Sequence, residues 1–184
     1  MIKKKISGQR TVLTYDYLWH NSFYSLETAK NTNKGRFYNL MTSEVFACFS
    51  IEAFLNHIGS IKISEWSLIE RCLSPKEKLI LIASRANKAI DFGKRPYQSL
   101  IELFTFRNFI VHGKTEIIQF NGELTKEDSP VLPNTKMEEY ISLEKAQKYL
   151  DDSEKIMKNV HAFFNKDEFV LGVPEFSNWL ITQE

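Results

Sequence analysis

The sequence has few cysteines, few glycines and no long apolar run, and each shortage excludes a class of protein. Cys48 and Cys72 are the only cysteines, too few for a disulfide framework, so we expect a cytoplasmic protein. The seven glycines are scattered and form neither of the common glycine-rich phosphate loops. No apolar run reaches the roughly 18 residues of a membrane span, and the basic start MIKKKISGQR lacks a signal-peptide core, so we expect no membrane partner.

Charge of one sign is also lacking. Lysine and arginine together number 24, aspartate and glutamate 23, and the formal net charge is +1. An RNA-binding surface would therefore have to be a local basic patch. The chain has no HExxH or CxxC motif, and we expect neither a metal nor another cofactor.

The hydrophobic residues that are present repeat mainly with a helical period. A chain of 184 residues with 43% hydrophobic content suits one domain, and we expect residues 1–184 to form it. Ser74, Pro75 and Glu77 predict a capped helix start, whereas Gly59 and Gly113 predict helix ends. The predicted helices cover residues 15–29, 37–58, 74–87, 97–112 and 143–164.

These patterns predict an all-α protein, an up-and-down bundle of about five helices. The segment TEIIQFNGEL alternates in polarity and contains Asn121-Gly122, which predicts a short β-hairpin after the fourth helix. Residues 1–14 are expected to be an N-terminal extension. Residues 167–184 are too apolar to float free, and we expect them to pack on the bundle or on a second subunit.

The segment RNFIVHGK, residues 107–114, places polar side chains at the end of an otherwise apolar helix. Asn108 and His112 share one helix face, whereas Arg107 lies roughly 140° around the axis from His112 and about 7.5 Å along it. The three cannot form a compact site on one bare helix. We therefore expect two copies of this helix to pair across a two-fold axis, using surplus apolar residues near the motif. These residues are Ile101, Phe106 and Phe109.

Such a pairing would suit acid–base chemistry on RNA. The helix end favours a protonated His112 and two nearby arginines disfavour it, so the histidine can titrate near neutral pH. It could then take a proton from a ribose 2′-hydroxyl while Arg107 stabilises the charge that builds on the phosphate.

This arrangement resembles the HEPN (higher eukaryotes and prokaryotes nucleotide-binding) domains. Their signature is an arginine, often followed by a polar residue, and a histidine four to six residues further on, near the end of a bundle helix. RNFIVH matches the RN-x3-H form, and residues 40–118 are similar to a group of small bacterial members. The resemblance implies a helical homodimer with the motif at its interface. It also implies a metal-independent endoribonuclease that leaves a 2′,3′-cyclic phosphate.

The same resemblance assigns roles to individual residues. It makes Arg107 the phosphate-binding residue, His112 the general base or acid, and Asn108 the polar residue that orients either of them. Glu52, on the second predicted helix, is an auxiliary polar residue. A toxin or defence effector of this kind would act on RNA and be restrained by a partner such as an antitoxin or a nucleotidyltransferase.

A second interpretation stays open beside the first. The chain could be a catalytically inactive nucleotide- or protein-binding bundle that keeps the motif as a polar part of its interface. In the simplest structural account, Arg107 forms a salt bridge with an acid such as Glu52, and His112 only helps to end its helix.

Overall fold

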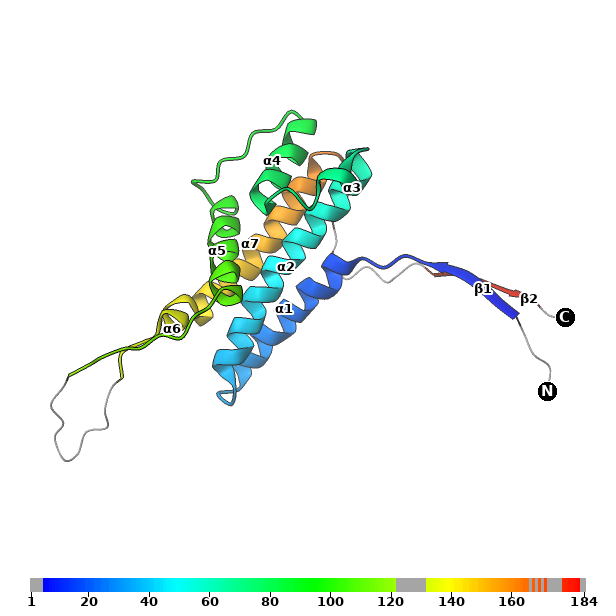
Figure 1. Cartoon of the computed structure of the whole chain (residues 1–184). Helices are drawn as coiled ribbons and strands as arrows, with labels where there is room; N and C mark the ends of the chain where they lie inside the picture. Colours follow the sequence, from blue (N-terminus) through cyan, green and yellow to red (C-terminus); the bar gives the residue numbers. More distant parts are fainter. Residues whose placement is uncertain are drawn as a thin grey trace, which may run out of the picture.

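The computed structural model describes residues 5–121, 132–165, 167, 169, 171 and 177–182. These residues form a mostly helical fold, as predicted, and Figure 1 shows the longer helices packed side by side. The elements in the described residues are β1 (Lys5–Arg10), α1 (Thr14–Asn31), α2 (Arg36–Lys62), α3 (Trp66–Ile69), α4 (Pro75–Arg85), α5 (Tyr97–Val111), α6 (Lys136–Tyr140), α7 (Leu143–Ala162) and β2 (Ser177–Thr182). The two short helices, α3 and α6, were not predicted.

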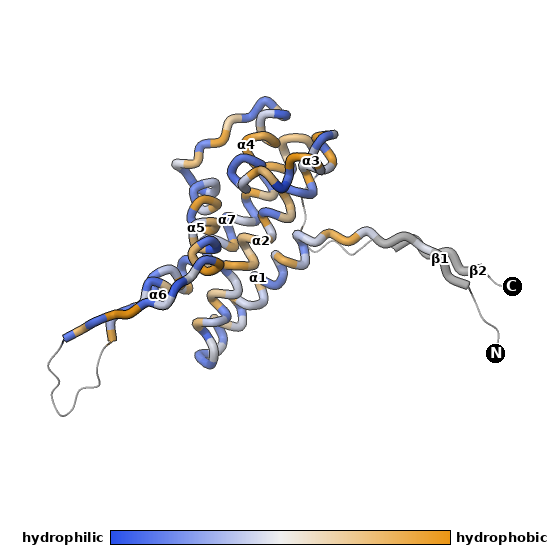
Figure 2. The backbone as a smooth tube through the Cα atoms, viewed as in Figure 1, coloured by the Kyte–Doolittle hydropathy of each residue, from blue (hydrophilic) through white to orange (hydrophobic). Residues whose placement is uncertain are grey.

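Helix α2 is the centre of the fold because it is apolar around most of its circumference. It contacts α1, α3, α4, α5 and α7, and Figure 2 shows hydrophobic residues along the sides of the helices that face one another. Its fully buried residues include Ile51, Phe54 and Leu55. None of the described helices is both long enough and apolar enough to cross a bilayer.

The helix starts follow local sequence rules. Ser74 caps α4 by accepting a hydrogen bond from the backbone N–H of Glu77, and the Glu77 carboxylate accepts one from the backbone of Ser74 in return. This confirms the predicted capping box. Ser142 caps α7 through the backbone N–H of Lys145. Helix α5 ends at Val111, one residue before the predicted end.

Gly59 does not end α2, and that prediction is wrong. The helix continues to Lys62, and Gly59 lies in its last turns against the indole of Trp66. A Cβ at this position would be 2.3 Å from the indole, which is buried. The glycine is therefore needed for close packing and not for a helix end.

The predicted hairpin does not appear in the described part of its segment. Residues 114–121 contain no strand, and Ile117 and Phe120 are exposed there, with no partner strand among the described residues. Gly122 and the rest of the predicted hairpin lie outside the described residues. Figure 2 shows hydrophobic positions on this segment where it leaves α5.

The strands of the structure lie elsewhere. β1 pairs antiparallel with β2, in a register that runs from Lys5 opposite Thr182 to Arg10 opposite Ser177. Figure 1 shows this two-stranded sheet leading away from the helices. Between α7 and β2, Phe169 and Leu171 pack against the helical core.

Candidate functional site

Arg107 lies near the C-terminal end of α5, and its side chain faces α2. Its Nη2 atom is 3.6 Å from Oε2 of Glu52, and its guanidinium lies over the ring of Phe104 at 5.3 Å. The side chain is 27% exposed, and its buried Nε has no hydrogen-bond partner in the part of the chain that the structure describes. The buried Nε is out of reach of a ligand, but at 3.6 Å the Glu52 carboxylate does not form a hydrogen bond with Nη2, and this terminal donor can turn to a ligand.

Glu52 is shared between two cations from different helices. Its Oε1 accepts a hydrogen bond of 3.3 Å from Nζ of Lys78, which projects from α4 and is buried. Its Oε2 faces Arg107. We call Glu52, Lys78 and Arg107 the Glu52 cluster. With all three groups ionised, two positive charges face one negative charge, and the cluster carries one net positive charge.

Cys48 lies one helical turn before Glu52, and its buried side chain lies beside this site. Burial raises the pKa of its thiol to about 12, although the nearby Arg107 guanidinium opposes the rise. The thiol therefore stays protonated at neutral pH and is not a nucleophile.

Asn108 and His112 lie on the outer surface, as the helical spacing requires. Both are exposed, and neither side chain forms a hydrogen bond or ion pair with another described residue. His112 is the C-cap of α5, and its backbone N–H donates to the carbonyl of Asn108 at 3.0 Å. The structure therefore joins Arg107 to Glu52, one pair of the predicted residues. It does not bring the side chains of Arg107 and His112 together within one copy of the chain.

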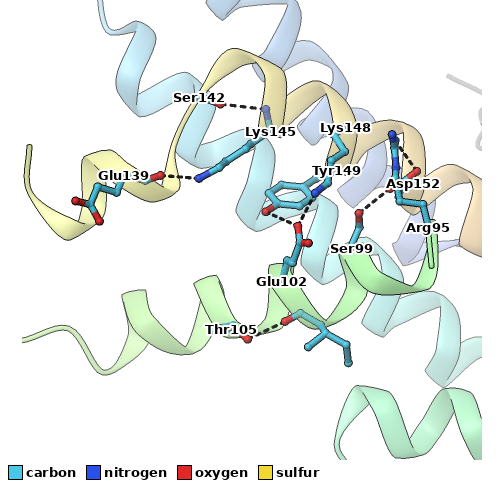
Figure 3. A network of polar contacts seen from close by, with 11 residues as sticks. Arg95, Ser99, Glu102, Thr105, Glu139, Ser142, Lys145, Lys148, Tyr149 and Asp152 are labelled. Atoms are coloured by element: carbon cyan, nitrogen blue, oxygen red, sulfur yellow. Dashed lines mark hydrogen bonds and ion pairs between the residues drawn. The ribbon is translucent and has the colours of Figure 1, made fainter. Parts of the chain in front are cut away.

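A second polar cluster joins α5 to α7 and was missed in the sequence (Figure 3). Asp152 is 1% exposed and accepts hydrogen bonds from Nε and Nη2 of Arg95, at 2.7 and 2.9 Å, and from Oγ of Ser99 at 2.6 Å. Beside it, Glu102 accepts from Nζ of Lys148 and from the Tyr149 hydroxyl. The Asp152 carboxylate is fully paired, which suits a structural role in holding the two helices together.

Glu44, on α2, is the other group that sequence reasoning missed. It is completely buried, and neither carboxylate oxygen has a hydrogen-bond partner among the described residues. Burial raises its pKa to about 8, although the nearby backbone N–H of Ser142, which lies outside hydrogen-bond geometry, and the charges of Lys145 and Lys148 pull the pKa down. Glu44 is therefore mostly protonated at neutral pH.

Neither metal-site geometry nor comparison with known proteins adds to this description. No group of three or more His, Cys, Asp or Glu side chains within the described ranges lies in positions that could hold a metal ion. No protein-family model, curated protein or solved structure matches the chain. The described residues thus offer a half-buried cationic site between α5 and α2 and, facing another direction, an exposed histidine at the end of α5.

Proposed function

We propose that the protein is a metal-independent endoribonuclease of the HEPN type that acts as a homodimer. The observation that carries this proposal is the state of Arg107. Its guanidinium is partly exposed, is held beside α2, and meets the Glu52 carboxylate only at 3.6 Å, beyond hydrogen-bond distance. A planar guanidinium of this kind is suited to the phosphodiester of RNA, because it can bind two phosphate oxygens at once.

A dimer can bring together the arginine and the histidine that one copy keeps apart. Arg107 faces α2 and His112 faces solvent at the end of the same helix, so one copy presents its two groups in different directions. Two copies that pair through the ends of α5 bring the histidine of one close to the arginine of the other. Of the apolar residues expected at this interface, Phe106 is buried inside one copy and is not available. The partly exposed Ile101 and Phe109 remain, and the exposed Asn108 and Val111 then lie at the same interface.

The chemistry follows from these groups. His112 takes the proton of a ribose 2′-hydroxyl, and the resulting oxygen attacks the adjacent phosphorus. The bond from phosphorus to the 5′-oxygen breaks, and a protonated histidine returns a proton to that leaving oxygen. The products are a 2′,3′-cyclic phosphate and a 5′-hydroxyl. Arg107 stabilises the charge on the phosphate oxygens, and Asn108 orients the phosphate or the histidine.

The test is cleavage of single-stranded RNA by the purified protein in EDTA. His112→Ala is expected to lower the rate by about 10²- to 10⁴-fold, the usual contribution of a general acid or base. Arg107→Ala should be similarly damaging, and Arg107→Lys should recover only part of the rate, since lysine lacks the planar fork. His20→Ala, a change on α1 outside the site, is the matched control and should keep full activity.

The substrate provides an independent check. An RNA with hydrogen in place of the 2′-hydroxyl at the cut site should not be cleaved, because that oxygen is the nucleophile. Cleavage that survives both the His112 and Arg107 changes, or that needs added magnesium, would contradict the mechanism. The same proposal includes a role as a toxin or defence effector in the cytoplasm. It also includes a partner that restrains the activity, either an antitoxin or a nucleotidyltransferase.

One observation favours a second candidate function, a catalytically inactive nucleotide- or protein-binding module. Arg107 pairs with Glu52 inside one copy and so has a structural use without any reaction, whereas His112 contributes only its backbone N–H to the end of α5. Purified protein that binds nucleotides but cleaves no RNA, with the same behaviour in His112→Ala, would support this module instead.

A further inference from the structure

The two cations of the Glu52 cluster hold their shared carboxylate unequally. Lys78 is within hydrogen-bond distance of Oε1, at 3.3 Å, and its side chain is 5% exposed. Arg107 is 3.6 Å from Oε2, and its side chain is 27% exposed. Since charge pairs strengthen with burial when their geometry is good, Lys78 is the stronger partner of Glu52 and Arg107 is the weaker one.

This asymmetry determines which of the two ion pairs of Glu52 an incoming anion can replace. Removing Glu52 from Lys78 would leave a buried, unpaired ammonium, which is strongly unfavourable. Removing Glu52 from Arg107 leaves a guanidinium that the anion itself can pair. A phosphate group that reaches the cluster from solvent can therefore replace Glu52 at Arg107 while Glu52 stays with Lys78.

We propose that the Glu52 cluster is a binding site for a single phosphate group, in which Glu52 is a displaceable counter-ion of Arg107. Lys78 is the positioning residue that retains Glu52 when phosphate binds. The one net positive charge of the cluster then matches one phosphodiester. This inference rests on the proposed role of Arg107 as the phosphate-binding residue, and it adds Lys78, on α4, to a site that otherwise uses only α2 and α5.

If Lys78 holds Glu52 away from Arg107, the affinity for phosphate should depend on both Lys78 and Glu52, which would not be so for a lysine that only stabilises the fold. Without Lys78, the carboxylate has Arg107 as its only partner in the cluster, and it competes directly with phosphate. Lys78→Met should therefore weaken phosphate binding by about tenfold or more, the scale of one charge-assisted hydrogen bond. Adding Glu52→Gln to Lys78→Met removes the competitor, and the double variant should regain most of the lost affinity.

The experiment uses the full chain and two probes that it cannot cleave. Calorimetric titrations with inorganic phosphate and with a short oligonucleotide carrying 2′-deoxy substitutions give dissociation constants for wild type, Lys78→Met and Lys78→Met/Glu52→Gln. Arg107→Ala should abolish specific binding of both probes, and Lys76→Met, a change of an exposed lysine on α4, should leave both constants unchanged. Binding of the oligonucleotide identifies an RNA phosphodiester as the ligand, whereas binding of inorganic phosphate alone identifies a free or terminal phosphate.

The outcomes separate this inference from the nuclease proposal, because neither probe undergoes a reaction. Recovery in the double variant supports the site even if no RNA is ever cleaved. Equal loss in the single and double variants, or phosphate binding that survives Arg107→Ala, overturns it. If Lys78→Met does not fold, Glu52→Gln alone decides, since it should bind phosphate more tightly than wild type, and unchanged or weaker binding refutes the displaceable counter-ion.

Discussion

Glu44 provides the sharpest prediction about stability. Its carboxyl group is buried without a hydrogen-bond partner among the described residues, and its pKa rises from 4.5 to about 8 on folding. The folded protein therefore holds a proton on Glu44 over a pH range in which the unfolded chain has already released it. The contribution of Glu44 to stability must fall as the pH rises from about 4.5 to about 8, and then level off.

The size of the effect follows from the two pKa values. Each pKa unit corresponds to about 1.4 kcal/mol, so the full loss of unfolding free energy above pH 8 is about 5 kcal/mol, and about 3 kcal/mol is already lost at pH 7. Glu44→Gln keeps the shape of the side chain and cannot ionise. The variant should match the wild type to within about 1 kcal/mol at pH 5 and exceed its stability by several kcal/mol at pH 8.5.

Urea unfolding followed by circular dichroism at a series of pH values between 5 and 9 measures this difference. Other groups that titrate on folding cancel when Glu44→Gln is subtracted from wild type. Thr28→Ala, an exposed change on α1 that adds and removes no ionisable group, is the control, and its difference from wild type should not vary with pH. A wild-type to Glu44→Gln difference that stays constant from pH 5 to 9 would refute the reasoning, because it would mean that Glu44 ionises normally in the folded state.

Substitutions at three further positions test the packing of Gly59, the N-cap of α4 and the hydrogen bonds of Asp152. Gly59→Ala should lower the free energy of unfolding by about 1 to 3 kcal/mol, because its Cβ would meet the indole of Trp66, and thermal unfolding measures this loss. Ser74→Ala should cost about 1 kcal/mol by removing the N-cap of α4, and a urea midpoint unchanged from wild type would contradict the capping account. Asp152→Ala should cost about 2 kcal/mol or more through its lost hydrogen bonds to Arg95 and Ser99, as measured by urea unfolding, and Asp152→Asn should recover only part of that stability.

Local patterns predicted what depends on local physics. The cap at Ser74 needs only residues three positions apart, and the sequence was sufficient to predict it. Gly59 was misassigned because the same glycine can end a helix or admit a bulky neighbour, and only the position of Trp66 in space distinguishes the two.

Contacts between side chains far apart in the sequence could not be predicted. Asp152 and Ser99 are 53 positions apart, and nothing near either residue indicates the other. The sequence did contain a sign that Asp152 is buried, because it lies four residues before Ile156 on the apolar face of α7, but it contained no sign of its partner. For the candidate site, the sequence named Arg107 and the acid that it meets, Glu52, but it gave no sign of Lys78, which the packing of α4 against α2 brings to the same carboxylate.

The hydrogen bonds of Asp152 anchor the N-terminal end of α5 and leave its C-terminal end without a similar anchor among the described residues. Before the first turn, Arg95 is tied to the buried Asp152 of α7, and Ser99 in that turn is tied to the same carboxylate, whereas the last turn ends in the exposed Val111 and His112. Fraying should therefore begin at the motif end, and backbone amide exchange with deuterium should be slow near Leu103 and fast after Asn108. The outer part of the motif thus lies on the least protected turn of an otherwise anchored helix, where a small local opening changes its geometry without disturbing the core.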